Sequence, residues 1–441
     1  MRDLRSVLAE RGFRRLFATR LVSQAGDGLF TSGLGTYVFF NATSFPDPGA
    51  AAAAFAVLYL PYSLIGPFAG VFIDRWPRRH ILAWSPLLRT VFVLAAAALV
   101  GSGQLGVPLY AAALLVFGVN RFFLSALSAG TPHVVPRDKL VLANSVAPTS
   151  GTIMTAVGLL AGTSLHLATG GGPGGSAAIL LCGGVLYLAA GLVAMRMPVD
   201  LLGPAAAERS ARASVAAEVR VVAAGLAAGL AHIAGRRRAA AVLTATALQR
   251  FLYGILLLMS ILLYRNFFYA RAGAAAALSH YLIVGASSAV GYAAAAVVTP
   301  WATRRLTMTG WVTVLLAAAG IGTAVLGAGF TQAGFIPLGF LLGLVAQGVT
   351  IATTTIIQQE ADDDFLGRVF SVNDMLYNGA FSLGAAACAA FMPLDGRSYA
   401  LLLAAAAGYA AAAPVFWLLA RQPSGPPGGF RPPASAQASS S

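Results

Sequence analysis

Apolar stretches far longer than a soluble protein's interior requires recur along the whole of this sequence. A helix crosses a bilayer with about 20 apolar residues, and several of these runs exceed that length. Alanine, leucine, glycine and valine follow one another without the alternation that membrane-spanning strands need, which argues against a membrane barrel. Of all residues, 58% are hydrophobic and 10% are charged. The sequence therefore predicts an all-α, polytopic membrane protein.

Basic residues lie mainly between the apolar runs. The formal net charge is +14, which in a soluble chain would indicate a nucleic-acid partner. Of the 29 lysines and arginines, however, 23 lie in segments expected in the cytoplasm, three outside and three within helices. Cytoplasmic segments of membrane proteins carry such an excess. The pattern predicts that both termini are cytoplasmic and that the chain resides in the cytoplasmic (cell) membrane, with the lipid bilayer and no nucleic acid as partner.

Twelve apolar segments are expected to cross the membrane as two six-helix bundles, 1–197 and 239–421. A basic cytoplasmic linker at 198–238 joins them, and the Pro-, Gly- and Ser-rich tail at 422–441 is expected to be disordered. Arg304 and Arg305 follow Arg78 and Arg79 by 226 residues, and Arg250 follows Arg20 by 230, which indicates related halves. The predicted helices are 16–40, 50–73, 81–100, 107–130, 141–167, 177–197, 239–263, 277–301, 308–328, 335–358, 368–393 and 399–420.

A charged hinge separates the second and third predicted helices. Its motif residues are Gly70, Asp74, Arg75, Arg78 and Arg79. The glycine allows two helices to approach closely, and the arginines hold the loop in water. The pattern resembles the loop between helices 2 and 3 in the major facilitator superfamily of secondary transporters, except that Pro77 replaces a usual glycine. The resemblance implies a major facilitator fold in which these residues latch the two halves together.

Three further segments resemble one branch of that superfamily. Residues 13–16, 24–27 and 367–371 are similar to bacterial exporters that include enterobactin and macrolide efflux proteins. This resemblance implies an alternating-access exporter of small organic molecules, such as drug-like compounds or natural products, working by proton antiport. The alternatives are an uncoupled or differently coupled carrier of organic anions such as siderophores and, as a minor alternative, a membrane enzyme or non-transporting scaffold. Gly158 and Gly162 resemble part of an antiporter glycine motif, but close helix packing explains them equally well.

Two acidic residues inside predicted helices are candidates for proton coupling. Asp27 and Asp374 would lie in a low-dielectric bundle, where burial favours the neutral form of a carboxyl group. A permanent ion pair between Asp27 and Arg121 or Arg250 would instead make Asp27 a structural residue. Both interpretations remain open from the sequence.

Other polar and aromatic residues are candidates for lining a substrate cavity. Arg20, Gln24 and Asp27 share one face of the first helix, and a polar stripe follows the tenth. The membrane arginines are candidates to neutralise an anionic substrate, and the aromatic residues to wall an apolar pocket. Hydrogen bonds between helices and ordinary packing are the alternatives. The full set is Arg20, Gln24, Arg89, Arg121, Arg250, Tyr253, Gln347, Thr350, Thr354, Tyr377 and Asn378.

Sequence signals for enzymes and cofactors are missing. The chain has no phosphate-binding loop, no G-x-S-x-G or H-E-x-x-H motif, and scattered histidines. Its two cysteines, Cys182 and Cys388, both lie in apolar runs, which predicts neither a disulfide framework nor a metal site. We expect a monomer without a cofactor, acting on a small-molecule substrate and driven by the proton gradient.

Overall fold

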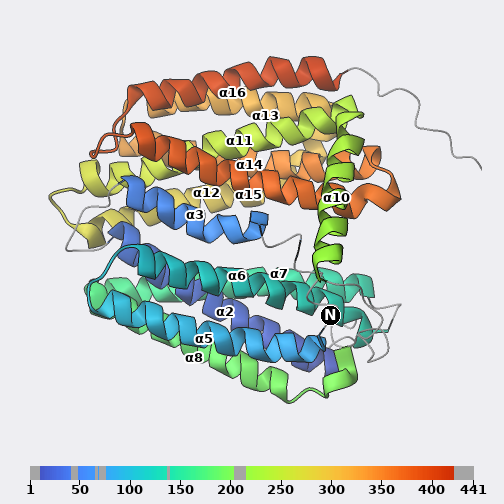
Figure 1. The fold of residues 1–441 in the computed structure, drawn as a ribbon. Helices are drawn as coiled ribbons and strands as arrows, with labels where there is room; N and C mark the ends of the chain where they lie inside the picture. Colours follow the sequence, from blue (N-terminus) through green and yellow to red (C-terminus); the bar gives the residue numbers. More distant parts are fainter. Residues whose placement is uncertain are drawn as a thin grey trace, which may run out of the picture.

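The computed structural model describes residues 10–40, 48–64, 68, 76–136, 140–202 and 215–421. All regular secondary structure in these residues is helical, which confirms the all-α prediction (Figure 1). The long helices are α2 (Arg11–Phe40), α3 (Pro48–Leu64), α5 (Arg78–Gly101), α6 (Val107–Gly130), α7 (Leu140–Ala168), α8 (Pro173–Met195), α10 (Val215–Ala234), α11 (Arg237–Leu262), α12 (Ala274–Thr303), α13 (Met308–Gly327), α14 (Gln332–Glu360), α15 (Asp363–Phe391) and α16 (Tyr399–Ala420). Short helical turns are η2 (Thr131–His133), η4 (Val199–Leu202) and η5 (Leu263–Phe268).

Nine helices of the described chain are long and apolar enough to cross a membrane. They are α5, α6, α7 from Val146 onward, α8, α11, α12, α13, α14 and α16. Of the other three expected spans, α3 has only 17 described residues, and α2 and α15 carry the polar and charged side chains considered below. The polytopic prediction is confirmed, whereas the number of twelve spans stays a prediction.

Local sequence explains several helix ends. Thr307, Thr331 and Ser398 each accept a hydrogen bond from the backbone N–H three residues later, at the start of α13, α14 and α16. These bonds satisfy a donor that a first helical turn leaves unpaired. The seventh predicted helix was expected to end at residue 263, but η5 extends it as a π-helical turn through Phe268. Arg265 in this turn, expected in an outside loop, is buried.

A closely crossed pair of helices with glycines at the crossing occurs in each half, α2–α7 in the first and α11–α15 in the second. A Cβ atom on Gly28 of α2 would lie 2.1 Å from the Thr155 carbonyl oxygen, and one on Gly158 of α7 would lie 2.2 Å from that of Ala25. In the second half, a Cβ on Gly254 of α11 would lie 2.4 Å from the Phe381 carbonyl oxygen, and one on Gly384 of α15 2.0 Å from that of Phe251. Only glycine permits such close approach of two backbones.

The two crossings repeat with one offset. Gly254 follows Gly28 by 226 residues, and Gly384 follows Gly158 by the same 226. This agrees with the offset between the two arginine pairs predicted from the sequence. It also corrects the proposed match between Arg250 and Arg20, because 226 residues before Arg250 lies Gln24, one helical turn further along α2.

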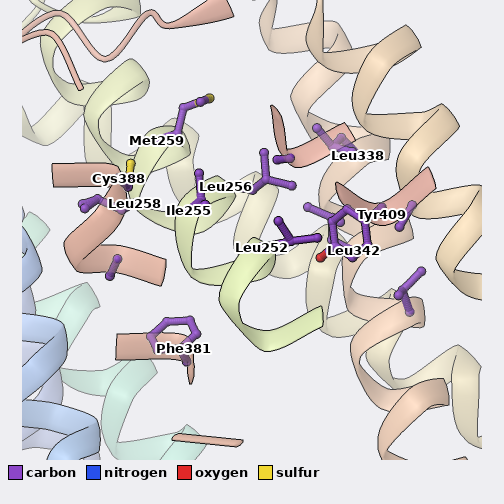
Figure 2. Packing of buried hydrophobic residues seen from close by; sticks show 14 of the residues in the cluster. Leu252, Ile255, Leu256, Leu258, Met259, Leu338, Leu342, Phe381, Cys388 and Tyr409 are labelled. Carbon is purple, nitrogen blue, oxygen red and sulfur yellow. The ribbon is translucent and has the colours of Figure 1, made fainter. Parts of the chain in front are cut away.

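The two halves meet through the end of α2 and through α3. In Figure 1, α2, α5, α6, α7 and α8 form the lower group, while α3 lies beside the helices of the C-terminal half and packs against α15. Phe40 at the end of α2 contacts Tyr281 of α12, with ring centroids 5.9 Å apart. Phe55 of α3 contacts Phe381 of α15 at 5.4 Å, edge to face. Phe40 and Phe55 therefore belong to the hydrophobic core of the C-terminal half, part of which Figure 2 shows.

Helix α10 runs across the ends of the other helices (Figure 1). The sequence predicted an amphipathic segment at 215–233, and the structure has a helix over Val215–Ala234. Ile233 packs with Leu243, Ile357 and Val369, so α10 is attached to the C-terminal half. Its predicted location on the inner membrane surface stays a prediction, as do the proposed domain boundaries.

Candidate functional site

A buried ionic cluster joins four helices of the N-terminal half. Arg89 of α5 has no exposed surface, and its guanidinium donates to the carboxylate of Asp27 on α2. The same guanidinium donates to Asn120 of α6 at 3.1 Å, to Tyr187 of α8 at 2.6 Å and to Ser23 at 3.2 Å. The carboxylate is thus paired with a residue that the sequence analysis had considered only as a substrate cation.

Asp27 receives further hydrogen bonds that fix its position. The Tyr187 hydroxyl donates to one carboxylate oxygen at 2.9 Å, and the Asn120 amide donates to the other at 3.3 Å. Three donors therefore hold this carboxylate in place, and Asp27 is only 7% exposed. The sequence left open whether Asp27 pairs with Arg121 or Arg250. The structure pairs it with Arg89, an arginine of its own half.

Arg20 and Gln24 form a second polar pair on α2. Arg20 Nε donates to Gln24 Oε1 at 2.9 Å. Both side chains lie against α7 at Gly151, where an added Cβ would meet Gln24 Oε1 at 1.6 Å. Arg20 and Gln24 of this predicted face therefore lie against α7, whereas Asp27 contacts α5, α6 and α8, all in the N-terminal half.

Arg250 of α11 is surrounded by aromatic rings. Its guanidinium carbon lies 3.9 Å from the ring centroid of Tyr377 and 5.2 Å from those of Tyr253 and Phe381. Its side chain is 6% exposed, and Nε has no hydrogen-bond partner. The structure therefore brings together three predicted site residues, Arg250, Tyr253 and Tyr377.

Asp374 and Arg121 interact electrostatically although they belong to different halves. Arg121 of α6 is close enough to Asp374 of α15 to act on its charge, and Asp374 is exposed whereas Asp27 is buried. Asn378, one turn further along α15, donates to the Asp374 backbone carbonyl at 2.9 Å. Asp374 is thus the accessible member of the two predicted proton-coupling carboxylates.

In the polar stripe on α14, the hydroxyls of Thr350 and Thr354 do not hydrogen-bond to the site residues described above. Thr350 and Thr354 donate to carbonyl oxygens one turn earlier in their own helix, at 2.8 and 3.0 Å. The Oε1 atom of Gln347 is buried without a hydrogen-bond partner. Neither hydroxyl makes the interhelical bond that was the alternative to a cavity-lining role.

The predicted latch is only partly within the described residues. Gly70, Asp74 and Arg75 lie outside them. Arg78 donates to the carbonyls of Ala129 and Leu202 at 3.0 Å each, and Arg79 donates to Met195 at 2.7 Å. These two arginines thus bind carbonyls at helix ends within the N-terminal half.

A cavity of about 210 Å³ lies inside the C-terminal half, between α11, α12 and α14. Its walls include Leu256, Leu338 and Leu342, which Figure 2 shows between α11 and α14. The hydroxyls of Ser260 and Tyr281 also line it and lie 3.2 Å apart. Tyr253 forms one wall, so the cavity adjoins the aromatic rings around Arg250.

Sequence analysis missed three residues that complete these groups, Asn120, Tyr187 and Tyr281, whereas Phe381 was already a candidate, with Tyr253 and Tyr377, for the wall of an apolar pocket. None belongs to a motif, and each acquires its role through a helix distant in sequence. Asn120 carried the clearest signal, because an amide beside Arg121 in the middle of an apolar helix needs a polar partner.

Long apolar helices in two related halves, with ionised side chains between helices and a cavity inside one half, form the architecture of a membrane transporter. The sequence profile of the Major Facilitator Superfamily matches residues 16–385. Uncharacterized transporters of this type from Mycobacterium bovis and Mycobacterium tuberculosis are each 35% identical over 418 residues, covering 95% of this chain and 93% of theirs. The crystal structure of the nucleoside transporter NupG has a TM-score of 0.67 at 14% identity, covering 94% of this chain and 100% of that one. The chain belongs to the Major Facilitator Superfamily and is a transporter, not an enzyme.

Proposed function

We propose that this protein is a secondary active transporter that exports a small organic molecule by alternating access. The observation that carries the proposal is the contact between the halves. Phe40, the last residue of α2, and Phe55 of α3 contact the C-terminal half, and α2 ends opposite α10 in Figure 1. In addition, the charge of Arg121 in one half acts on Asp374 in the other. Separation of the aromatic contacts, with closure at the α10 end, would expose the intervening space to the opposite side of the membrane.

The proposed topology has twelve spans in two bundles, 1–197 and 239–421, joined by the linker at 198–238. Adding α2, α3 and α15 to the nine apolar helices gives this number. The start of α2 and the end of α16 lie at the same end of the molecule as α10, as an even number of spans requires (Figure 1). Because most basic residues lie in segments assigned to this end, it is the proposed cytoplasmic side of the cell membrane. We propose that the protein acts there as a monomer.

Proton antiport through Asp374 is the proposed energy source. Asp374 is exposed and interacts with Arg121 of the other half, so a change in its charge alters the attraction between the halves. Asp27 is proposed as a structural residue because its carboxylate is fixed by Arg89, Tyr187 and Asn120. The likeness to bacterial drug and siderophore exporters at 13–16, 24–27 and 367–371 supports the export direction.

Transport into proteoliposomes under an imposed pH gradient tests this function. Inverted vesicles with an acidic lumen should accumulate candidate organic compounds faster than protein-free liposomes. Asp374→Asn should remove the response to the gradient. Asp395→Asn, in the loop before α16, is the matched control and should leave it unchanged, since asparagine can still accept the hydrogen bond from the Arg397 backbone N–H. If Asp374→Asn responded to the pH gradient as strongly as wild type, Asp374 would be excluded from proton coupling.

A further inference from the structure

Arg250 is a buried cation without an anionic partner. Its side chain is 6% exposed, and no group of the described residues accepts a hydrogen bond from it or forms an ion pair with it. Arg89, which is also deeply buried, has four hydrogen-bonding partners including Asp27. A charge removed from water is costly unless it is paired. The contrast indicates that the partner of Arg250 is not part of the protein.

Aromatic rings compensate the charge of Arg250 only in part. Tyr377, at 3.9 Å, lies closest to the guanidinium, and Tyr253 and Phe381 lie further away. Such contacts attract a cation but leave its N–H donors unsatisfied. Tyr377 and Tyr253 are both partly exposed, so a ligand can reach the rings beside the guanidinium.

An apolar space adjoins this cation. Tyr253 lies beside Arg250 and also lines the cavity of about 210 Å³, whose other walls are mainly apolar, with four leucines and Phe335, and include the hydroxyl residues Ser260, Tyr281 and Ser288. A ligand with a charged group at Arg250 and a hydrocarbon portion in the cavity would satisfy both environments.

The contacts between the halves involve the same residues. Tyr281, which lines the cavity, contacts Phe40 of α2, and Phe381, which contacts Arg250, also contacts Phe55 of α3. Separation of the halves at this end would therefore remove neighbours from both the cavity wall and the aromatic rings around the cation.

We propose that the transported substrate is a small monocarboxylate with an apolar tail, its carboxylate paired with Arg250 and its tail in the adjoining cavity. Guanidinium and carboxylate form two parallel hydrogen bonds, which satisfies the donors that the rings leave unpaired. This inference rests on the proposed transport function and specifies its substrate class.

Titration calorimetry on the purified protein tests the inference with two acids and their neutral amides: octanoate against octanamide, and 4-phenylbutyrate against 4-phenylbutyramide. Wild type should bind at least one acid at least tenfold more tightly than its amide. Arg250→Met should lose this preference, whereas Arg305→Met should keep it. Arg305 is the matched control because it also lies over an aromatic ring, that of Trp301 at 4.8 Å, but is exposed.

Two further variants separate ligand binding from folding. Arg250→Met should have a melting temperature equal to or above that of wild type without ligand, because it removes an unpaired buried charge. A lower melting temperature would indicate a structural role and overturn the proposal. Gly285→Leu should fill the cavity and weaken binding of the preferred acid at least tenfold, since the glycine lines the cavity and has no atom within 4 Å of its Cβ position.

Failure of the substrate class can be told from failure of the transport function. Equal affinity for acid and amide, or no binding of either acid, overturns the carboxylate proposal alone if the proteoliposomes still accumulate other compounds. Absence of all transport, with carboxylate binding retained, would overturn the proposed function and leave Arg250 as a binding site only.

Discussion

At the scale of single residues, the hydrogen-bond and ion-pair partners of a carboxylate in the membrane determine its role. Asp27 and Asp374 are both acids in helices of one transporter, yet Asp27 has a guanidinium, a phenol and an amide as donors. Asp374 is exposed and interacts with a cation of the other half. The first arrangement holds a charge in place, whereas the second makes a charge sensitive to movement between the halves.

Asp27→Asn should strongly destabilise the protein, because it leaves Arg89 charged, fully buried and without its carboxylate. Breaking a buried ion pair by removing one partner costs about 3–5 kcal/mol. We expect a large fall in the melting temperature of the detergent-solubilised protein, and partial recovery in Asp27→Asn/Arg89→Met. Asp395→Asn should change it little. Normal stability together with loss of proton dependence would instead show that Asp27 carries the proton.

The sequence was sufficient to find the ionisable residues but not their partners. Charges in apolar helices are rare, so Asp27, Arg89, Arg121, Arg250 and Asp374 were visible as candidates. Which of them meet depends on how far each helix is rotated and shifted along its axis. Residues 27, 89, 120 and 187 come together only after four helices have packed, and no spacing in the sequence encodes that.

At the scale of elements, glycines determine how closely the helices cross. The α2–α7 and α11–α15 pairs each place glycine where a Cβ would overlap a backbone carbonyl of the partner helix. Long apolar runs made the helices predictable, but with 49 glycines in the chain the sequence did not show which lie at a crossing. Gly158 was noticed, and its packing interpretation agrees with the contact to Ala25.

Gly28→Ala and Gly254→Ala should destabilise the fold because the added methyl group meets a carbonyl oxygen at 2.1 and 2.4 Å. Overpacking of this kind costs about 1–3 kcal/mol. Gly35→Ala in α2 and Gly285→Ala in α12 are matched controls, since nothing lies within 4 Å of their Cβ positions. We expect lower melting temperatures for the first two variants only. Equal melting temperatures in all four would contradict the close crossings.

The attachment of α10 should weaken in acid. His232 stacks on Phe365 with centroids 4.1 Å apart, and burial together with the charge of Arg236 lowers the pKa of His232, with Asp362 acting in the opposite direction. The docked state therefore favours neutral imidazole. Its stabilisation is present above the ordinary histidine pKa of about 6.5 and declines as pH falls below it.

Hydrogen exchange measures this effect directly. After correction for intrinsic rates, amides of α10 should exchange faster at pH 5.5 than at pH 7.5 relative to those of α13. His232→Phe should abolish the difference. Protection of α10 that is independent of pH in the wild type would contradict the proposed role of this histidine.

At the scale of the whole molecule, the proposed topology has an even number of spans, in keeping with the start of α2 and the end of α16 lying at the same end of the molecule (Figure 1). Reporter fusions after Arg421 and within the linker at 203–214 should both indicate a cytoplasmic position, and fusions at Gln104 and Gly170 an external one. A cytoplasmic reporter at either of the last two positions would contradict the twelve-span topology.

Alternating access requires the two ends of the molecule to open in opposite senses, and spin-label distances in lipid nanodiscs measure this most directly. One pair joins Gln104 to His280 at the end opposite α10, and the other joins Arg14 to Gln359 at the α10 end, all exposed positions in a background lacking Cys182 and Cys388. For each pair we predict a short and a long distance, whose populations change between pH 5.5 and pH 8. As the population at the long distance increases for one pair, it should decrease for the other. A single unchanging distance for both pairs, or populations that shift in the same direction, would contradict the account.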